Sequence, residues 1–395
     1  MRILLANKFY YRRGGDCVYS IELENLLKAA GHDVAFFAMD YPENMDSSWK
    51  NFWPSEVAFT PKKLVAFFKA FKRPFGDGET VKKFTALLDE FKPNVLHLNN
   101  VHTQLSPMLA EIAHARGIKV VWTLHDYKLV CPAYTCLSNG KVCEDCFAGD
   151  KRNCTAKKCL KNNWLASKIA EREAVAWNRE RLEKCVDTFI CPSRFMKAKM
   201  EQGGFDSQKL VAFHNFIDES KFVYDSVARE KSYCFVGRLS SEKGVETLLQ
   251  VASKIDVPLY VLGSGPLEAE LKDRFASVPQ ICFMGHCDWD TCKLVLLKSK
   301  FSVVPSEWYE NNPFSVIEPL CLGTPVLGAN IGGIPELIEM GKTGELFEPG
   351  NAVDLEAKIR LMLENDYSFD SAPLRKYFSK DHYLEQMMSV YGTCK

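Results

Sequence analysis

Short apolar segments with strand character alternate with amphipathic segments of helical character along almost the whole chain. The first repeat reads "RILLANKF", then "VYSIELENLLKAA" after a Gly-rich turn, then "DVAFFAM" after a Gly-His stop. A strand, a helix and a second strand in this order form a βαβ unit, whose strands run parallel. The alternation therefore predicts a doubly wound α/β fold.

The alternation occurs in two series, which predicts two domains. The first series continues through the expected strands "NVLHL", "KVVWTL" and "DTFICPS", and the second runs through "SYCFVG", "PLYVLG", "ICFMG", "FSVVPS" and "PVLGA". Between the two series, residues 214–232 are polar and turn-like, and we expect this segment to link the domains. A chain of 395 residues with 47% hydrophobic content also suits two cores better than one.

Charge and hydropathy exclude several classes of protein. The 50 basic and 50 acidic side chains balance, so no overall field favours a nucleic-acid partner. No apolar run reaches the roughly 18 to 20 residues that span a bilayer, and the apolar stretch at the start is too short for a signal peptide. We therefore expect a cytoplasmic protein.

The stretch "SEWYENNPFSVIEPLCLGTP" carries two glutamates around an Asn-Pro pair. Asn312 followed by Pro313 predicts a helix that is capped by the asparagine and runs over 313–322. Glu310 then precedes the positive end of this helix, and Glu318 lies within it. The two carboxylates are placed to hold two parts of one elongated ligand whose anionic middle rests at the helix N-terminus. The alternative is a loop glutamate and a solvated helix glutamate.

Two cations and a glycine turn follow neighbouring strands of the second series. Arg238 and Lys243 come after "SYCFV", at the carboxyl end of a strand, where open α/β sheets bind ligands. An Arg fork with a Lys nearby predicts a diphosphate clamp, although two solvated surface cations would read the same way. Gly263 and Gly265, in "GSGP", would let backbone approach a ligand closely.

Taken together, "VGRLSSEKGVETLL", "LGSGP", "FMGH" and "PSEWYENNPFSVIEPLCLGTPVLGANIGGIPELI" resemble the retaining nucleotide-sugar glycosyltransferases of family four. The resemblance extends to the first-half Gly-Gly loop, the "TLHD" segment and "PSRFMKAKMEQGGF". It implies the GT-B architecture: an α/β fold of two facing Rossmann-like domains with parallel sheets and an interdomain cleft. The implied acceptor domain is 1–222, joined by a terminal helix at about 376–395, and the donor domain is 223–375.

The resemblance also implies roles for residues of the second half. Glu318 would hold the donor ribose hydroxyls, Glu310 would contact hydroxyls of the donor sugar, and Arg238 with Lys243 would neutralise the leaving diphosphate. Backbone N–H groups around the start of the helix would bind sugar and phosphate, and they belong to Asn312, Phe314 and Ser315. Pro313 departs from the common glycine at its position, which rules out a backbone donor there.

In the first half, the resemblance places Gly14 and Gly15 close to the diphosphate or the acceptor. Without the resemblance, these two glycines would be interpreted as a turn before a helix. His125, at the end of "VVWTL", corresponds to the family histidine that touches the donor sugar. Asp126 would either orient this histidine or cap the following turn.

The implied activity is transfer of a sugar from a UDP or GDP type donor to a glycan or lipid-linked acceptor with retention of configuration. Surface polysaccharide or glycoconjugate synthesis is the expected setting. The transfer needs no metal, and we interpret the single Asp-x-Asp match, Asp288 to Asp290, as helix capping. The alternatives are a glycoside hydrolase that uses the paired glutamates and a sugar-nucleotide binding protein without catalysis.

The segment "KKLVAFFKAFKR", Lys62–Arg73, places Leu64, Phe67, Phe68 and Phe71 at helical spacing and carries five cations and no acid. It predicts peripheral attachment to an anionic membrane surface on the inner face. The alternative is an apolar face packed on the core with a solvated basic back.

Six cysteines fall within 29 residues, from Cys131 to Cys159. The set Cys143, Cys146, Cys154 and Cys159 could supply four thiolates to a structural zinc ion, which would order a stretch that has little core of its own. A redox pair at Cys143 and Cys146, or a loop of free reduced thiols, would give the same pattern.

Overall fold

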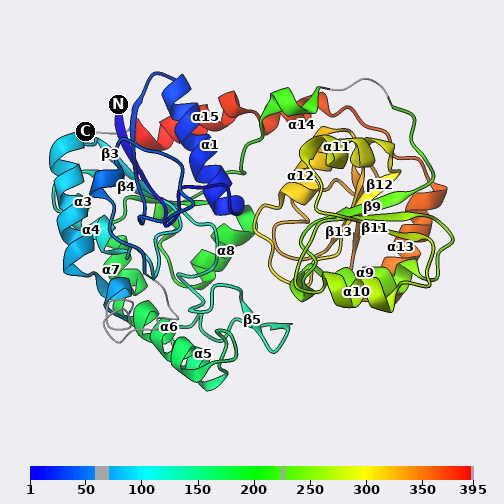
Figure 1. Ribbon diagram of the computed structural model, residues 1–395, viewed down its shortest axis with the longest axis horizontal. Helices are drawn as coiled ribbons and strands as arrows, with labels where there is room; N and C mark the ends of the chain where they lie inside the picture. The colour runs from blue at the N-terminus through cyan, green and yellow to red at the C-terminus, as the bar shows by residue number, and fades with distance from the viewer. Residues whose placement is uncertain (58–70, 224–226, 393–395) are drawn as a thin grey trace. The chain divides into compact units, whose positions relative to one another are not determined.

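The computed structural model describes residues 1–57, 71–223 and 227–392, which form two compact units (Figure 1). The first unit contains Met1–Cys136, Cys143–Asn215 and the chain from Tyr383 onward. The second contains Leu137–Val142 and Phe216–His382. Each unit is built on its own parallel sheet of six strands, which confirms the predicted α/β class.

The sheet of the first unit has the strand order β2-β1-β3-β4-β7-β8. All its strands pair in parallel, and their residues are almost entirely buried because helices cover both faces. The bounds are β1 Arg2–Ala6, β2 Asp33–Phe37, β3 Val95–Leu98, β4 Lys119–Thr123, β7 Thr188–Cys191 and β8 Leu210–Ala212.

The helices of the first unit begin mostly at residues whose side chains cap them. Asp77, Asn163 and Ser193 each accept a hydrogen bond from a backbone N–H of the first turn. The α-helices are α1 Gly15–Ala29, α3 Gly78–Phe91, α4 Met108–His114, α5 Arg152–Ala156, α6 Trp164–Ala176, α7 Arg179–Glu183 and α8 Arg194–Gln202. Short 3-10 turns lie at η1 Lys50–Phe52, η2 Arg73–Phe75 and η3 Ser207–Lys209.

The sheet of the second unit has the order β11-β10-β9-β12-β13-β14. Because β9 is followed in space by β10 on one side and β12 on the other, the strand order reverses between β9 and β12. Such a switch point is where open α/β sheets bind ligands. The bounds are β9 Tyr233–Val236, β10 Leu259–Leu262, β11 Ile281–Gly285, β12 Phe301–Val304, β13 Val326–Ala329 and β14 Gly344–Phe347.

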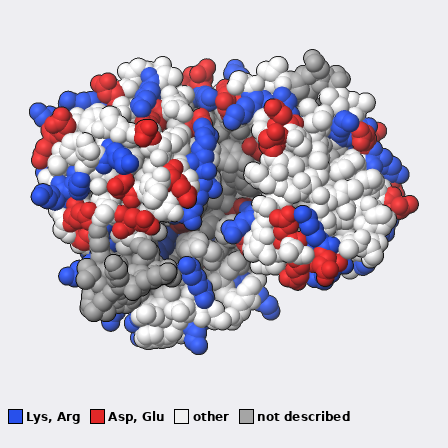
Figure 2. All heavy atoms as spheres, in the orientation of Figure 1, with Lys and Arg blue, Asp and Glu red and all other residues white. Residues whose placement is uncertain are grey.

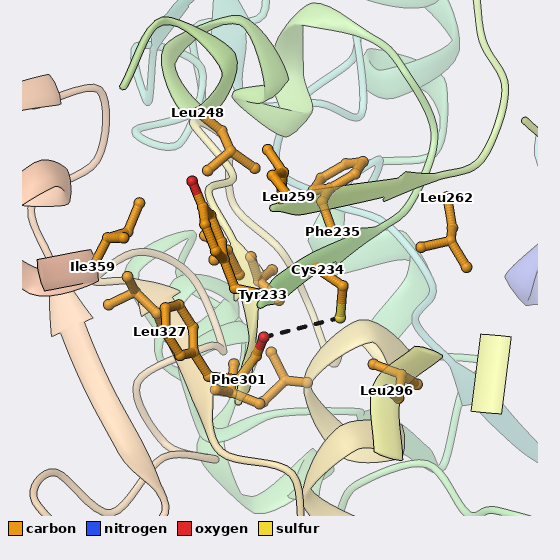
Figure 3. Close-up of a cluster of buried hydrophobic side chains, with 14 of the residues drawn as sticks. Tyr233, Cys234, Phe235, Leu248, Leu259, Leu262, Leu296, Phe301, Leu327 and Ile359 are labelled. Atoms are coloured by element: carbon orange, nitrogen blue, oxygen red, sulfur yellow. Dashed lines mark hydrogen bonds between the residues drawn. The ribbon is translucent and has the colours of Figure 1, made fainter. Parts of the chain in front are cut away.

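Helices cover both faces of this second sheet, with α9 and α10 on one face and α11 and α12 on the other (Figure 1). Side chains from β9, β10, β12 and β13 meet helical residues such as Leu248 and Leu296 in a continuous apolar core (Figure 3). The helices are α9 Val245–Ala252, α10 Glu268–Arg274, α11 Trp289–Lys298, α12 Phe314–Cys321, α13 Ala352–Glu364 and α14 Ala372–Tyr377, with 3-10 turns at η4 Glu219–Phe222 and η5 Ser241–Lys243.

The ten strands expected from the sequence are all present, and the structure adds four short ones. Strands β8 and β14 lie at the edges of the two sheets, and β5 Leu137–Ser138 pairs with β6 Lys141–Val142 in a hairpin. The expected capping role of Asp288 is confirmed, because its carboxylate accepts the N–H of Thr291 at 2.9 Å at the start of α11.

The last helix, α15 Lys380–Tyr391, supplies side chains to the core of the first unit. The hydroxyls of Tyr383 and Tyr19 are 2.5 Å apart, and the Tyr391 hydroxyl bonds His97 Nδ1 on β3. The chain thus returns to the first unit at Tyr383, a few residues later than the expected 376.

Most of the segment expected to contact a membrane, including Leu64, Phe67 and Phe68, lies outside the described residues. Its last cation, Arg73, lies within the described residues, and its side chain is not the solvated charge that the core-packing alternative expected. The Arg73 side chain is fully buried, with Nε 2.6 Å from Asp77 and Nη2 3.5 Å from Glu79. It also donates to the carbonyls of Ser55 and Gln104. Arg73 therefore joins three parts of the first unit.

We expect Arg73→Ala to lower the free energy of unfolding by about 3 kcal/mol or more, because it leaves two carboxylates without their buried counter-charge. Urea unfolding followed by circular dichroism measures the change.

The matched control is Arg116→Ala, which removes a surface arginine 3.4 Å from Asp89. An exposed pair of this kind contributes roughly 0 to 1 kcal/mol. Equal losses in the two variants would show that the Arg73 cluster is not a stabilising contact.

Candidate functional site

Loops at the carboxyl ends of β9 and β12 bring together the candidate residues of the second unit. The turn after β9 carries Arg238 and Lys243, and the loop after β12 carries Glu310 ahead of α12. Parallel strands place these ends at one edge of the sheet, here at its switch point. The structure thus brings together Lys243 and Glu310, which are separated by 67 positions in the sequence.

Glu310 is buried and receives three hydrogen bonds on one oxygen. Its Oε1 accepts from Lys243 Nζ at 2.6 Å, Ser306 Oγ at 2.7 Å and Trp308 Nε1 at 2.9 Å. Burial alone would raise the pKa of this carboxyl, but the Lys243 ammonium and the three hydrogen bonds outweigh burial and lower it. Glu310 is therefore ionised at neutral pH. Its Oε2 accepts no bond from any residue in the described part of the chain, so it is available to a ligand hydroxyl.

Glu318 has the opposite electrostatic character. It is half-buried on α12, and its carboxylate has no hydrogen bond or ion pair with a described residue. Burial raises its pKa to about 7, and Lys221 opposes this only in part. A carboxyl without a protein partner can accept from two adjacent hydroxyls, as a ribose would present.

The Arg238 side chain is exposed and, within the described ranges, forms no ion pair or hydrogen bond. The two glycines that were expected to approach a ligand lie against the backbone next to this arginine. A Cβ on Gly263 would lie 1.9 Å from Gly237 O, and one on Gly265 would lie 2.3 Å from Leu239 O. The Leu239 N–H also donates to Ser264 O at 3.0 Å. Both glycines therefore hold the loop that presents Arg238.

The start of α12 lies one residue later than expected. The helix begins at Phe314, with Pro313 in an extended conformation as the N-cap and no side chain capping the first turn. Asn312 is thus not the helix cap, because the fixed ring and extended ψ of Pro313 separate it from the first turn. Asn312 is buried, and Phe314 and Ser315 form the first helical residues, whose N–H groups have no partner within the helix.

Gly332, which the sequence analysis did not single out, supports the Glu310 loop. Its φ is +63°, and a Cβ there would lie 2.4 Å from Glu310 O and 2.6 Å from Glu310 N. The neighbouring Gly333 N–H donates to Glu310 O at 2.8 Å. The repeated glycines in "NIGGIPEL" were the sequence signal for this contact.

In the first unit, a second polar cluster lies after β1, β3 and β4. Gly14 is the extended N-cap of α1 and Gly15 its first residue, and a Cβ on Gly15 would meet nothing within 4 Å. Asp16 follows them, with its Oδ2 3.8 Å from Lys8 Nζ and 3.1 Å from Asn100 Nδ2. These contacts outweigh the effect of burial and lower the pKa of Asp16. Sequence analysis missed Lys8, Asp16 and Asn100, which carry no motif of their own.

His125 follows β4 and is held by an asparagine. Its Nε2 lies 3.0 Å from Asn99 Oδ1, and its ring makes a T-shaped contact with the ring of Tyr19. Burial lowers the pKa of His125 to about 4, although Asp16 opposes the shift. The ring is therefore neutral at physiological pH, with the proton on Nε2 if that nitrogen donates to the amide oxygen. Asp126 caps the next turn, because its Oδ1 accepts the Lys128 N–H at 2.9 Å.

The cysteine cluster contains no metal-ligand set in the described structure. No group of three or more His, Cys, Asp or Glu among the described residues, which include Cys143, Cys146, Cys154 and Cys159, is arranged to hold a metal ion. Cys146 and Cys154 are buried, whereas Cys143 and Cys159 are partly exposed. The described arrangement therefore does not fit a tetrathiolate zinc site, and zinc content remains a prediction for elemental analysis.

We expect Glu318→Gln to stabilise the folded protein more at pH 8 than at pH 5. The pKa of Glu318 is higher in the folded state than in the unfolded chain, so the folded state holds an extra proton between about pH 4.5 and 7. The stability that this proton gives the folded state is fully present below that window and is lost as pH rises through 7. The glutamine amide cannot ionise, so the variant does not lose stability in this way as pH rises.

Urea unfolding at both pH values tests the effect, with Glu356→Gln on α13 as a surface control. A stability difference between Glu318→Gln and the native chain that does not change with pH would contradict the assignment.

We expect Gly332→Ala to lower the free energy of unfolding by about 2 kcal/mol or more, because the alanine combines strain in the left-handed backbone conformation with a clash against the Glu310 backbone. Gly341→Ala isolates the strain, since Gly341 has φ +74° but nothing within 4 Å of its Cβ. Thermal and urea unfolding of both variants give the comparison, and similar losses would mean that the clash at Glu310 is relieved.

Comparison with known proteins identifies the family of the chain. The pattern of the family described as Glycosyltransferase Family 4 matches residues 13–221, and that of Glycosyl transferases group 1 matches residues 216–384. An uncharacterised 42.6 kDa protein of the cps region of Klebsiella pneumoniae is 23% identical over 99% of this chain and 100% of its own length.

Solved structures show the same fold across the full chain. A lipopolysaccharide outer core galactosyltransferase has a TM-score of 0.67 at 14% identity, covering 99% of both chains. An Anabaena protein in complex with UDP-glucose has a TM-score of 0.64 at 14% identity, covering 100% of both chains. These similarities identify the fold as GT-B, and the matched family patterns show that the chain belongs to the group 1, family 4 glycosyltransferases.

Proposed function

We propose that the protein transfers a sugar from a nucleoside-diphosphate donor to a glycan or lipid-linked acceptor with retention of anomeric configuration. The observation that carries this proposal is the group of side chains at the switch point of the second unit. There, counting contacts with residues 1–57, 71–223 and 227–392, an ionised carboxylate has one oxygen without a partner, a second carboxyl forms no bond, and an exposed arginine has no counter-ion.

The chemistry of each group fits one part of such a donor. Arg238 and Lys243 supply positive charge to the diphosphate, and the first N–H groups of α12 add to it. Glu318 accepts the ribose hydroxyls. The free Oε2 of Glu310 accepts a hydroxyl of the sugar, while Lys243, Ser306 and Trp308 fix the carboxylate in place.

In the proposed reaction the nucleoside diphosphate leaves from the face of the sugar on which the acceptor hydroxyl attacks. The protein lowers the barrier by stabilising the charge on the leaving diphosphate and by positioning both reactants. The acceptor is assigned to the first unit. His125, as a neutral ring, is suited to hydrogen bonding with the transferred sugar and does not supply a positive charge.

Relatives support the setting of this activity. The Klebsiella relative comes from a cps region, and the galactosyltransferase neighbour acts on lipopolysaccharide. Surface polysaccharide or glycoconjugate synthesis is therefore the proposed pathway class. The Anabaena complex with UDP-glucose supports a uridine donor ahead of a guanosine donor.

We expect one of UDP-glucose, UDP-galactose, UDP-N-acetylglucosamine and GDP-mannose to raise the melting temperature and to release nucleotide in the presence of an acceptor extract. Proton NMR of the glycosidic product should show the anomeric configuration of the donor. Glu318→Gln should weaken nucleotide binding by about ten- to a hundredfold, because it removes a charge-assisted hydrogen-bond acceptor. The control Glu356→Gln should bind normally.

The three candidate functions give different products. Free sugar with no dependence on acceptor would indicate a hydrolase, and binding without turnover would indicate a binding protein. An inverted product would contradict retention while leaving the transferase assignment intact.

A further inference from the structure

The helix α6 presents large apolar side chains to solvent. Trp164 is 55% exposed, Leu165 is 48% exposed and Val175 is 56% exposed. Trp164 and Val175 are separated by about three helical turns and so lie on the same face. The opposite face is buried through Ser167 and Ala170. The exposed apolar face of α6 is therefore not needed for packing within the first unit.

Cations surround these apolar side chains. Residues 151–170 contain six Lys and Arg residues and no Asp or Glu. Lys158, Lys161 and Arg172 are exposed and form no ion pair with any residue that the structure describes. Arg172 lies about two turns after Trp164, on the same face as Trp164 and Val175. We call this set of six residues, Lys158, Lys161, Trp164, Leu165, Arg172 and Val175, the α6 surface.

The backbone that precedes α6 holds Lys158 and Lys161 of this surface in a fixed turn. Lys158, Lys161 and Asn162 have φ of +50°, +55° and +51°, a conformation that side-chain-bearing residues rarely adopt. Asn163 then caps α6 by accepting the N–H of Ala166 at 2.9 Å. Such a strained backbone conformation persists only where the surrounding structure enforces it. The turn thus places the two lysines beside the first turn of α6.

All six residues of the α6 surface are exposed to solvent. In Figure 2, the atoms not drawn in grey at the lower edge of the molecule, where Figure 1 places α5, are mostly white and blue. The nearby cations Lys157 and Lys168 are paired with Asp145 and Glu171, so the unpaired charge comes from the α6 surface itself.

We propose that the α6 surface docks on an anionic phospholipid bilayer. Tryptophan and leucine side chains partition into the interface between headgroups and acyl chains, and lysine and arginine bind the negative surface. Charge complementarity favours this occupant over a second copy of the chain, because two copies would bring the unpaired cations together. The apolar Leu165 and Val175 favour it over a nucleic acid, whose phosphates bind cations and polar groups.

Vesicle flotation without substrate tests the proposal separately from the transfer reaction. The neutral vesicles are phosphatidylcholine alone, and the anionic vesicles are phosphatidylcholine with about 30% phosphatidylglycerol. We expect binding to the anionic vesicles only. Both Lys158→Glu/Lys161→Glu and Trp164→Ser/Leu165→Ser should weaken this binding by about tenfold or more, because the first removes cations that bind the negative surface and the second removes apolar side chains that enter the interface.

Two double variants in the second unit serve as controls. Lys231→Glu/Lys376→Glu makes the same change in net charge at exposed lysines, and Met340→Ser/Val353→Ser removes apolar side chains that are 57% and 79% exposed. Both should bind like the native chain, and melting temperatures establish that all four variants fold.

Four results would overturn the proposal. The first is equal recovery of the protein on neutral and anionic vesicles, and the second is an equal loss of vesicle binding in the α6 and control variants. The third is a loss of vesicle binding only in Lys69→Glu/Lys72→Glu, which would move the contact to the segment Lys62–Arg73. The fourth is retention of vesicle binding by the α6 variants together with lost binding to polyuridylate, which would identify a nucleic-acid surface.

Discussion

All strands of each sheet run in the same direction, and the positions of the functional groups depend on this constraint. Parallel strands need helical crossovers, and the crossovers bury both faces of the sheet. Only the strand ends are left to reach solvent, and all carboxyl ends gather at one edge. Lys243 and Glu310 meet there because their loops leave neighbouring strands, β9 and β12, where the strand order reverses.

The carboxylate of Glu310 is buried at this edge, so its surroundings must stabilise its negative charge. A lysine, a serine and a tryptophan donate to one oxygen, and the positive φ of Gly332 lets a second loop lie against its backbone. Glu318 lacks such compensation and so has a raised pKa. The same site therefore holds one carboxylate that is fixed and charged and another that responds to pH and ligand.

Long, strongly apolar strands and the Gly-rich and Asn-Pro loops were predictable from sequence, because each has a local signature. The edge strands β8 and β14 were not, since β8 has three residues and "GELF" mixes polar and apolar side chains. Glu310, Lys243 and Arg238 were singled out as candidates through their motifs. Asp16, Lys8 and Asn100 were missed because their association depends on the pairing of β1 with β3, which no short pattern reports. The one-residue shift at Pro313 likewise depends on the extended ψ that the loop imposes.

The return of the chain at α15 makes the second unit an insertion within the first, as far as sequence order is concerned. Tyr383 and Tyr391 complete the first core only when the last residues of the chain are available. During synthesis, which proceeds from the N-terminus at roughly 5 to 20 residues per second, the second unit can therefore close before the first is finished. The unit that begins to emerge first would be the last to reach its final packing, and until then β3 and α1 would expose apolar surface that a chaperone could bind.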